Sequence, residues 1–373
     1  MNNKSPMNHN RRNLLKAISA TAVALPFSSW VSAEVASRGG KKLGLAMVGL
    51  GNYATKQIAV GLQRSDYWNI TGIVTGTPAK IPEWKQKWHL KDNNIFNYEN
   101  FDKIIESKDI DAVYICLPNS MHAEFTIRAA KAGKHVICEK PMAVSVVEAE
   151  QMIKACDDAG VKLAIGYRLH FNAHHQQVME WTRKKTFGPI EYVNANFGFA
   201  IGNPDQWRLK KALAGGGPLM DVGIYCVQAA RYATGEEPVS IKAQFAPVSD
   251  PIKFKEVEEG ISWQMNFPSG AYMTGFCGYN SYIDELYVGT AKKSYKIEPA
   301  YSYGPLTGQF IGGEKIEFPH MHHQFMQMEG MGPLFQNPQP MPDHISGVEG
   351  LKDMKILMAI YEAARTGKEV KLV

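Results

Sequence analysis

Cysteine is scarce in this chain of 373 residues, which has five cysteines, an odd number. No two of them have the C-x-x-C spacing of a zinc site or a redox motif, and the set does not suit a disulfide framework. Most lie within apolar strand or helix patterns, where a free thiol behaves as a small hydrophobic residue. The five are Cys116, Cys138, Cys156, Cys226 and Cys277.

Long hydrophobic runs are also missing. The apolar run Ala17 to Phe27 is too short to span a bilayer as an anchor. It follows a basic start and precedes Val31-Ser32-Ala33, as in an export signal that is cleaved, and Asn10 to Lys16 resembles the twin-arginine signal of proteins exported already folded. We expect residues 1–33 to be a twin-arginine-type signal peptide and the mature protein to be periplasmic, with no membrane contact. An ordinary secretory signal with two arginines is the alternative.

An excess of one charge is absent once this leader is set aside. Four of the 41 Lys and Arg residues and none of the 36 Asp and Glu residues lie in it, which leaves 37 basic and 36 acidic residues. A net charge near zero gives no basic field for nucleic acid or anionic lipid. We therefore expect no nucleic-acid partner.

The N-terminal half of the mature chain alternates strand and helix patterns. Apolar runs typical of buried parallel strands are separated by helical stretches such as Tyr53 to Arg64, and Ser145 to Glu148 has the spacing of a capping box. The alternation predicts a doubly wound parallel sheet, a Rossmann domain, over residues 34–165. The expected strands are Leu43 to Leu50, Trp68 to Thr75, Asp111 to Leu117, His135 to Cys138 and Lys162 to Gly166.

A glycine-rich turn follows the first of these strands and precedes a helix. Its sequence, Gly49-Leu50-Gly51-Asn52-Tyr53-Ala54, is a G-x-G-x-x-A motif. Such glycines permit a tight turn and let the backbone approach a pyrophosphate, which the helix N-terminus also attracts. We expect Gly49, Gly51, Asn52, Tyr53 and Ala54 to bind a dinucleotide; a tight turn without a ligand is the alternative.

The second strand ends without an acidic residue. An NAD site usually has Asp or Glu there, for the ribose 2′-hydroxyl. This chain has Thr75, Gly76 and Lys80 instead, and a hydroxyl and a lysine suit a 2′-phosphate. We therefore predict NADP rather than NAD, although Lys80 could be an ordinary surface charge.

Two later strands end in polar residues at the same edge, where ligands of open parallel sheets bind. One end runs from Leu117 to His122, and the other is Glu139-Lys140-Pro141, whose proline could hold a cis bond and fix Lys140 toward the cleft. A turn with solvated charges is the alternative. The further cofactor-binding candidates are Leu117, Pro118, Asn119, His122, Glu139 and Lys140.

The second half has longer strands and fewer helices, which predicts an α+β domain over residues 166–373 with a large, open, mostly antiparallel sheet. We expect a homo-oligomer, a dimer or tetramer, through the outer face of this sheet. The expected strands are Ile190 to Ala200, Ser240 to Ala246, Ile261 to Phe267, Ala271 to Cys277 and Glu285 to Val288, and Leu351 to Tyr361 form a final helix.

A helix that begins near Pro218 carries Asp221 and Tyr225, four residues apart on one face. They could be a hydrogen-bonded core pair. A phenol is a poor base near neutral pH unless a nearby cation favours its anion, and we expect Lys140 to supply that cation.

Two histidine groups could ligate a metal, His320 to His323 and the set His170, His174 and His175. Neither has an acid or cysteine that completes a ligand set, so we predict no metal. A loop lining the substrate pocket is the expected role of His320 to His323.

These motifs together resemble the glucose-fructose oxidoreductase/inositol dehydrogenase superfamily. The likeness rests on Glu139-Lys140-Pro141, the G-x-G-x-x-A turn and the Asp221/Tyr225 helix. Many relatives have histidine at the position of Tyr225, and tyrosine marks the sugar-oxidising subgroup. Further matching segments are Ile110 to Glu124, Gly166 to His170, Gln206 to Leu209, Arg231 to Pro238 and Ile360 to Gly367.

The resemblance implies a role for each site residue. Lys140 and Tyr225 would transfer the proton, and Asp221 would orient the sugar; Lys140, Tyr167, Asp221 and Tyr225 would bind substrate. Arg168, Trp207 and Arg208 would join the cofactor site. Specificity would depend on Phe199 to Leu213 and on the segment after Pro299, with Tyr301 and Tyr303.

The implied activity is oxidation of an aldose at C1 to the lactone, with tightly bound NADP recycled in place by reduction of a second sugar. The chain departs from exported relatives at Glu34 to Lys42, where it lacks a long proline-rich arm that helps to enclose the nucleotide. A nicotinamide-dependent glycosidase on the same fold and a non-catalytic sugar- or nucleotide-binding protein are the alternatives.

Overall fold

The computed structural model describes residues 41–372. The predicted signal peptide, residues 1–33, lies outside the described residues. Within the described part, no helix combines the length and the apolar character that a membrane crossing requires.

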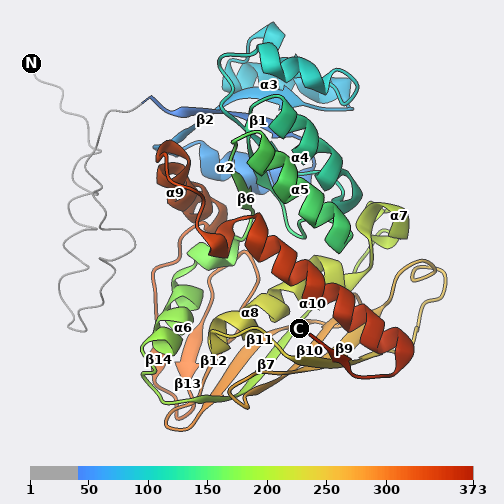
Figure 1. The fold of residues 1–373 in the computed structure, drawn as a ribbon, viewed down its shortest axis with the longest axis vertical. Coiled ribbons are helices and arrows are strands. Elements are labelled where there is room, and N and C mark those ends of the chain that lie inside the picture. The colour runs from blue at the N-terminus through green and yellow to red at the C-terminus, as the bar shows by residue number, and fades with distance from the viewer. Residues whose placement is uncertain (1–40, 373) are drawn as a thin grey trace, which may run out of the picture. The chain divides into compact units, whose positions relative to one another are not determined.

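A six-stranded parallel sheet has the order β3-β2-β1-β4-β5-β6, the Rossmann arrangement (Figure 1). β1 (Leu43–Val48) is buried along five of its six positions, as expected of a strand covered on both faces. The predicted doubly wound sheet is thus confirmed. The other strands are β2 (Trp68–Val74), β3 (Ile95–Phe96), β4 (Ala112–Ile115), β5 (His135–Cys138) and β6 (Leu163–Ile165).

Helices connect these strands. The helix expected over Tyr53 to Arg64 begins as a π-helical turn, Ala54–Ile58, before α2 (Ala59–Leu62). Ser145 caps α5 by accepting a hydrogen bond from Glu148 N at 3.2 Å, but the Glu148 side chain accepts from Val144 N rather than from the serine. The other helices here are α3 (Ile81–Trp88), α4 (His122–Lys131) and α5 (Val146–Asp158).

A nine-stranded sheet follows, in the order β14-β13-β12-β11-β7-β10-β9-β8-β15. Its strands pair antiparallel except for β7 with β10, and the β9–β10 hairpin turns at Gly270, where φ is +90°. The strands are β7 (Ile190–Gly198), β8 (Ser240–Phe245), β9 (Gly260–Asn266), β10 (Tyr272–Gly278), β11 (Ile283–Thr290), β12 (Tyr295–Ile297), β13 (Gly308–Phe310), β14 (Lys315–Ile316) and β15 (Val370–Lys371).

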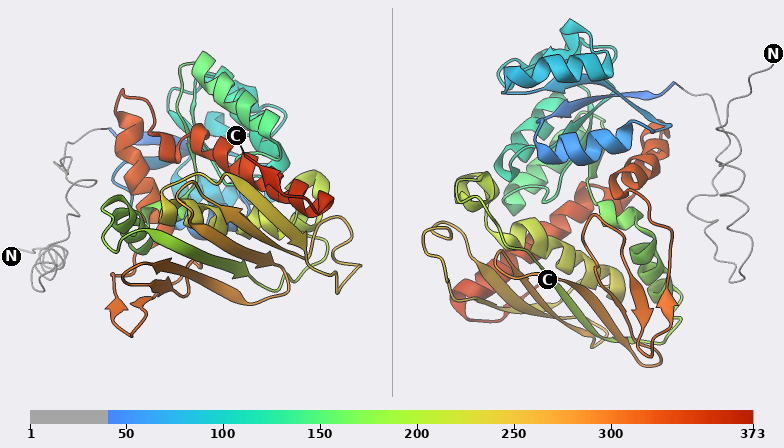
Figure 2. Two further views of the ribbon diagram at one scale, coloured as in Figure 1. Left: turned by 60° about the horizontal axis from the view of Figure 1, so that its bottom comes forward. Right: turned by 180° about the vertical axis from the view of Figure 1, so that it is seen from behind.

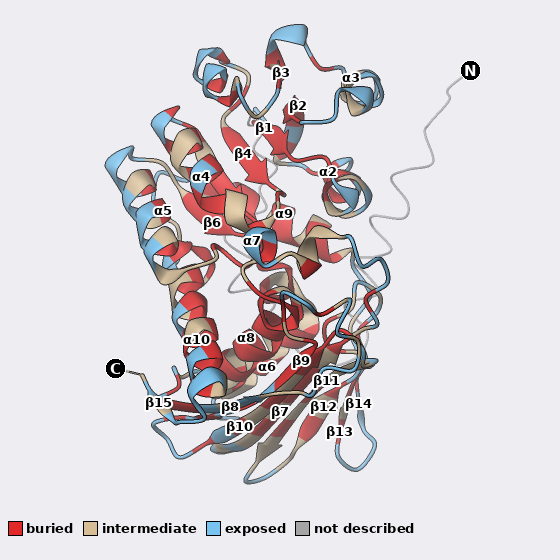
Figure 3. Ribbon diagram, turned by 90° about the vertical axis from the view of Figure 1, so that its right-hand side faces the viewer, coloured by how far each residue is buried: buried red, intermediate tan, exposed pale blue. Residues whose placement is uncertain are grey.

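One face of this sheet packs against α8 (Ile224–Thr234) and α10 (Gly347–Thr366), beside α6 (Ala173–Arg183) (Figure 2). No helix of residues 41–372 covers the other face. β9 shows the consequence, because its residues alternate between buried and exposed (Figure 3). Two tyrosines lie side by side on the uncovered face, Tyr192 and Tyr272, with ring centroids 5.1 Å apart.

Helix α9 (His323–Gln336) follows the strands of the second sheet but packs against α2 of the first part (Figure 1). Trp68 Nε1 donates to the carbonyl of Met328 at 2.9 Å, and Phe335 packs edge-on to the Trp68 ring. No helix is predicted from the sequence at α9, because glycines and Pro333 interrupt its apolar pattern. The predicted boundary after residue 165 stays a prediction, since the two parts share this core.

A buried ionic network joins α8 to α10. Arg231 donates to Glu349 at 2.8 Å and to Asp353 at 2.7 Å, and Asp353 also accepts from the hydroxyl of Tyr167. Burial raises the pKa of Asp353 to about 7; Glu349 adds to the shift and Arg231 opposes it.

This shift predicts a pH-dependent stability. An unfolded aspartate releases its proton near pH 4, whereas the folded protein holds the Asp353 proton until about pH 7. As pH rises from about 4 to about 7, the unfolding free energy of the wild type should therefore fall relative to that of Asp353→Asn, by up to a few kcal/mol. Urea denaturation across this range measures the difference.

The control is Asp158→Asn, which changes a carboxylate that is 64% exposed on α5. It should run parallel to the wild type across the pH range. A constant difference between the wild type and Asp353→Asn would show that Asp353 titrates alike in both states.

Candidate active site

A cavity of about 570 Å³ lies at the carboxyl ends of β1, β2, β4 and β5. Most of the predicted cofactor-binding residues line it, whereas Gly76 and Arg168 do not. The predicted residues in its wall are Gly49, Gly51, Asn52, Tyr53, Ala54, Thr75, Lys80, Leu117, Pro118, Asn119, His122, Glu139, Lys140, Trp207 and Arg208.

The two glycines of the first turn have different surroundings: Gly49 is packed against the backbone of the next strand end, and Gly51 faces the cavity. Gly49 has φ of +87°, and a Cβ there would lie 2.7 Å from the carbonyl oxygen of Cys116. A Cβ on Gly51 would meet no atom within 4 Å, although Gly51 lines the cavity. Its backbone is therefore open to a phosphate.

The end of β2 contributes hydroxyls and an amine to the wall, from Thr75, Thr77 and Lys80. Lys80 Nζ donates to the carbonyl of Leu50 at 2.6 Å, which places the ammonium beside the glycine turn. Gly76 does not line the cavity. A Cβ there would lie 2.7 Å from the ring of Tyr98, which does line it. The lining at this end has no carboxylate.

His122 ties the ends of β4 and β5 together. Its two ring nitrogens lie 2.8 Å from the carbonyl oxygen of Pro141 and 3.0 Å from that of Leu117. Burial lowers the pKa of His122, and the hydrogen bonds to the two carbonyl oxygens oppose this shift. His122 thus holds in place the two loops that carry the predicted site residues.

Glu139 is a buried carboxylate in the cavity wall. It accepts a hydrogen bond from the Tyr114 hydroxyl at 2.6 Å, which in turn accepts from Gln327 of α9 at 2.8 Å. Burial raises the pKa of Glu139, although Tyr114 and Lys140 oppose the shift.

Lys140 precedes a cis peptide bond to Pro141 and points toward Asp221 and Tyr225. Its ammonium donates to the backbone carbonyl of Asp221 at 2.6 Å and lies 3.4 Å from Oδ1 of that residue. It also lies 4.7 Å from the centroid of the Tyr225 ring. Lys140 is thus hydrogen-bonded to Asp221 and lies beside the phenol, in a cation–π contact with its ring, while its role in proton transfer stays a prediction.

The carboxylate of Asp221 lies between two cationic side chains, Lys140 and Arg208. Arg208 Nε donates to it at 3.0 Å, and the Tyr279 hydroxyl donates to the same oxygen at 3.0 Å. Burial would raise the pKa of Asp221, but Arg208 and Lys140 outweigh it and lower the pKa to about 2. Asp221 is therefore anionic at any pH of interest.

Arg168 is the cation that reaches the Tyr225 oxygen. Its Nε donates to Tyr225 Oη at 3.2 Å, and the other guanidinium nitrogens bind His323 Nδ1, at 2.9 Å, and the Tyr301 carbonyl. Arg168 is 2% exposed, and no carboxylate of residues 41–372 pairs with it. A buried guanidinium usually has an anionic partner, and this one has a phenol.

The turn that carries Asp221 is anchored by a second buried acid, Glu258. It accepts from the backbone amides of Gly217 and Leu219 at 2.9 and 3.1 Å, and from the Tyr361 hydroxyl at 2.7 Å. The turn Leu219–Gly223 is π-helical rather than the α-helical turn expected from the sequence.

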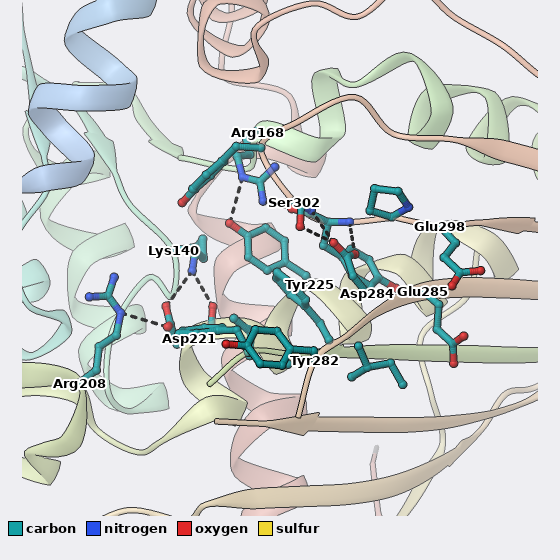
Figure 4. A pocket seen from close by; sticks show the side chains of 18 of the residues that line it. Lys140, Arg168, Arg208, Asp221, Tyr225, Tyr282, Asp284, Glu285, Glu298 and Ser302 are labelled. Carbon is teal, nitrogen blue, oxygen red and sulfur yellow. Dashed lines mark hydrogen bonds and ion pairs between the residues drawn. The ribbon is translucent and has the colours of Figure 1, made fainter. Parts of the chain in front are cut away.

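A second cavity, of about 990 Å³, opens from the same residues toward the nine-stranded sheet. Arg168 lines this cavity instead of the first. Figure 4 shows Lys140 directed at Asp221, and Arg168 at the hydroxyl end of Tyr225. The residues that line both cavities are Lys140, Gln206, Arg208, Asp221, Tyr225 and Tyr303.

Some predicted site residues lie elsewhere. Tyr167 is in the core, with its hydroxyl on Asp353, and lines neither cavity. His320 to His323 do not line the substrate pocket as expected, because His323 begins α9 and supports Arg168 from behind. In residues 41–372 no group of three or more His, Cys, Asp or Glu residues is arranged to hold a metal.

Sequence reasoning missed Asp284, which holds the loop after Pro299. Its carboxylate accepts from the amides of Ala300, Tyr301 and Ser302 at 2.8, 2.7 and 3.1 Å. Nothing in the sequence marks Asp284, since it lies inside a strand. Tyr303, which was expected to influence specificity, lines both cavities.

Two family models match the chain. The oxidoreductase family with an NAD-binding Rossmann fold matches residues 43–167, and the GFO/IDH/MocA C-terminal domain matches residues 175–295. D-xylose 1-dehydrogenase [NADP(+)] of Haloarcula marismortui is 28% identical over 338 residues, 88% of this chain and 92% of the relative.

Two solved structures also match this chain over most of its length. The aldose-aldose oxidoreductase from Caulobacter crescentus is 41% identical with a TM-score of 0.85, over 89% of this chain and 100% of that chain. KijD10, a 3-ketoreductase from Actinomadura kijaniata in complex with NADP and TDP-benzene, has a TM-score of 0.75 at 18% identity, over 87% and 98% of the two chains, which shows a shared fold alone. The chain belongs to the GFO/IDH/MocA family of oxidoreductases.

Proposed function

We propose that this protein is an NADP-dependent sugar oxidoreductase that oxidises an aldose at C1 to the lactone. The observation that carries the proposal is the meeting of two cavities at Lys140, Asp221 and Tyr225. One cavity has the features of a dinucleotide site, and the other is lined by aromatic and polar groups. The names of the xylose dehydrogenase and of the aldose-aldose oxidoreductase support an aldose as substrate.

The residues present fit NADP. Gly51 leaves its side of the first cavity open for the pyrophosphate, and Thr75, Thr77 and Lys80 offer donors for a 2′-phosphate where a carboxylate would repel it. Bound NADP would supply a hydride acceptor for C1 of the sugar and a hydride donor in the reverse reaction.

Tyr225 is the proposed acid and base. Tyr225 lines both cavities and its oxygen accepts a hydrogen bond from Arg168, which holds that oxygen in place to exchange a proton with the sugar hydroxyl. Lys140 holds the backbone and side chain of Asp221, and the anionic Asp221 can accept hydrogen bonds from other sugar hydroxyls.

The proposal also covers cofactor recycling, export and the oligomeric state. The cofactor stays bound and is recycled by reduction of a second sugar, which suits a protein exported folded to the periplasm, where no nicotinamide pool is expected. The uncovered face of the nine-stranded sheet, with Tyr192 and Tyr272, pairs with a second copy as a dimer or tetramer.

The proposal predicts bound nucleotide and aldose oxidation. Mature protein purified without added nucleotide should carry NADP(H), and glucose or xylose should be converted to the lactone. Tyr225→Phe should keep the bound nucleotide but lose at least about a hundredfold in kcat, because only the proton-transfer oxygen is removed. Absorbance at 340 nm measures the bound reduced nucleotide, and product analysis measures the lactone.

Each other outcome identifies an alternative. Release of free sugar from a glycoside without net oxidation would identify the glycosidase. Sugar binding without turnover in the wild type would identify a binding protein. Activity that requires added NADP would reject recycling in place and leave an ordinary dehydrogenase.

A second prediction concerns the 2′-phosphate. Lys80→Ala should raise the Kd for NADP about tenfold or more in nucleotide-stripped protein and change the Kd for NAD little, since a charged hydrogen bond is lost only with NADP. Titration calorimetry measures both. The matched control is Lys85→Ala, because Lys85 is a lysine of α3 that forms an ion pair with Asp92. Equal loss for both nucleotides would contradict this role of Lys80.

A further inference from the structure

We propose that Tyr279 is a positioning residue of the reaction: its hydroxyl fixes the direction of the Asp221 carboxylate, although the tyrosine itself lines neither cavity. The inference rests on the proposed aldose oxidation, in which Asp221 binds sugar hydroxyls. It also gives a role to the segment 246–259, between β8 and β9, which holds the tyrosine in place.

The two oxygens of Asp221 have different partners (Figure 4). Oδ2 accepts from Tyr279 Oη and from Arg208 Nε, each at 3.0 Å, whereas Oδ1 lies 3.4 Å from Lys140 Nζ. Two hydrogen bonds of normal length to one oxygen restrain the rotation of the carboxylate and leave the longer contact to the other oxygen. Oδ1 is therefore the oxygen available to a sugar hydroxyl, and its direction depends on the donors to Oδ2.

The protein holds these two donors to different degrees. The side chain of Arg208 is 34% exposed and lines both cavities, so a ligand in either cavity can compete for it. Tyr279 is fully buried and out of reach of such a ligand. Burial, and then the charge of Asp221, raise the pKa of the Tyr279 phenol well above its usual value, so the hydroxyl keeps its proton and donates.

Tyr279 directly follows β10, and hydrogen bonds hold its backbone on both sides. Its amide donates to the carbonyl of Glu259 at 2.9 Å, and its carbonyl accepts from the amide of Ile201 at 2.8 Å. The Glu259 carboxylate accepts from the amide and the hydroxyl of Ser249 and from the side chain of Asn280, each at 2.6 Å. The loop between β8 and β9 is thus closed at its base, beside the tyrosine.

The ring of Tyr279 packs in a small hydrophobic cluster that is separate from the two larger cores. Phe199 meets the ring edge-on, with ring centroids 5.3 Å apart. The other members come from two loops, residues 199–210 and 246–259, and they fix the ring and therefore the hydroxyl. They are Ile201, Leu209, Phe254 and Val257.

Two adjacent acids connect both ends of the contact between Tyr279 and Asp221. Glu258 accepts from backbone amides of the turn that carries Asp221, and the carbonyl of Glu259 accepts from the amide of Tyr279. Neighbouring residues of one segment therefore place the acceptor and the donor relative to each other.

The experiment measures kcat and KM for glucose and xylose in the wild-type holoenzyme and in Tyr279→Phe. The substitution removes only the hydroxyl that binds Asp221. It should lower kcat about tenfold and change KM less than about threefold, because the bound sugar then meets a carboxylate that is free to turn. The amount of bound nucleotide should stay that of the wild type.

The matched control is Tyr295→Phe. Tyr295 is also buried, at 1% exposure, and its hydroxyl has no hydrogen-bond partner among residues 41–372. This substitution removes the same atom from a buried tyrosine without the loss of a hydrogen bond, so it should change neither kcat nor KM.

A double-mutant cycle shows whether Tyr279 acts through Asp221. In an Asp221→Ala background, Tyr279→Phe should change kcat less than about twofold, since the group that it orients is gone. An equal loss in both backgrounds would overturn the inference, and so would wild-type kcat in Tyr279→Phe. Loss of bound nucleotide from Tyr279→Phe would indicate a structural role and would overturn it as well.

The failure of this inference differs from the failure of the proposed function. A wild type that oxidises aldoses keeps the proposed function whatever Tyr279→Phe does. A wild type that oxidises neither glucose nor xylose would overturn the proposed function, and the positioning role with it.

Discussion

The contact between the guanidinium of Arg168 and the hydroxyl of Tyr225 organises the site. Arg168 is a buried cation with no carboxylate partner among the described residues, and its Nε donates to the phenol oxygen at 3.2 Å. His323 and the Tyr301 carbonyl hold the guanidinium from the other side. The cation therefore cannot leave the phenol without breaking contacts with two other segments.

Those segments explain why elements far apart in sequence are required for one contact. Helix α9 packs on the Rossmann part and presents His323, while Asp284 of β11 fixes the loop that presents Tyr301. Glu258 fixes the turn before α8, which carries Tyr225. The two parts of the chain thus meet at the site, and the shared wall of the two cavities is its consequence.

Patterns that repeat locally were predictable from the sequence, and contacts that depend on tertiary packing were not. The alternating strands and the glycine turn gave the Rossmann sheet, and the long strands gave the open sheet, because periodicity and turn chemistry are local. Tyr167 shows the limit: the family resemblance implied a place in the substrate site, yet its hydroxyl donates to Asp353 in the core. Lys140 was placed in the right loop, but its hydrogen bonds go to Asp221, since side-chain partners depend on how the two sheets pack.

The most direct test of this account measures kcat and KM for an aldose in the wild type, Arg168→Lys and Arg168→Gln. If Arg168 holds the Tyr225 hydroxyl for proton transfer, kcat should fall at least about tenfold in Arg168→Gln and less in Arg168→Lys, which keeps a cation and a donor. KM should change less than kcat. Equal losses in the two variants, or a loss confined to KM, would contradict the account, because the charge of residue 168 would then not act on the reacting oxygen.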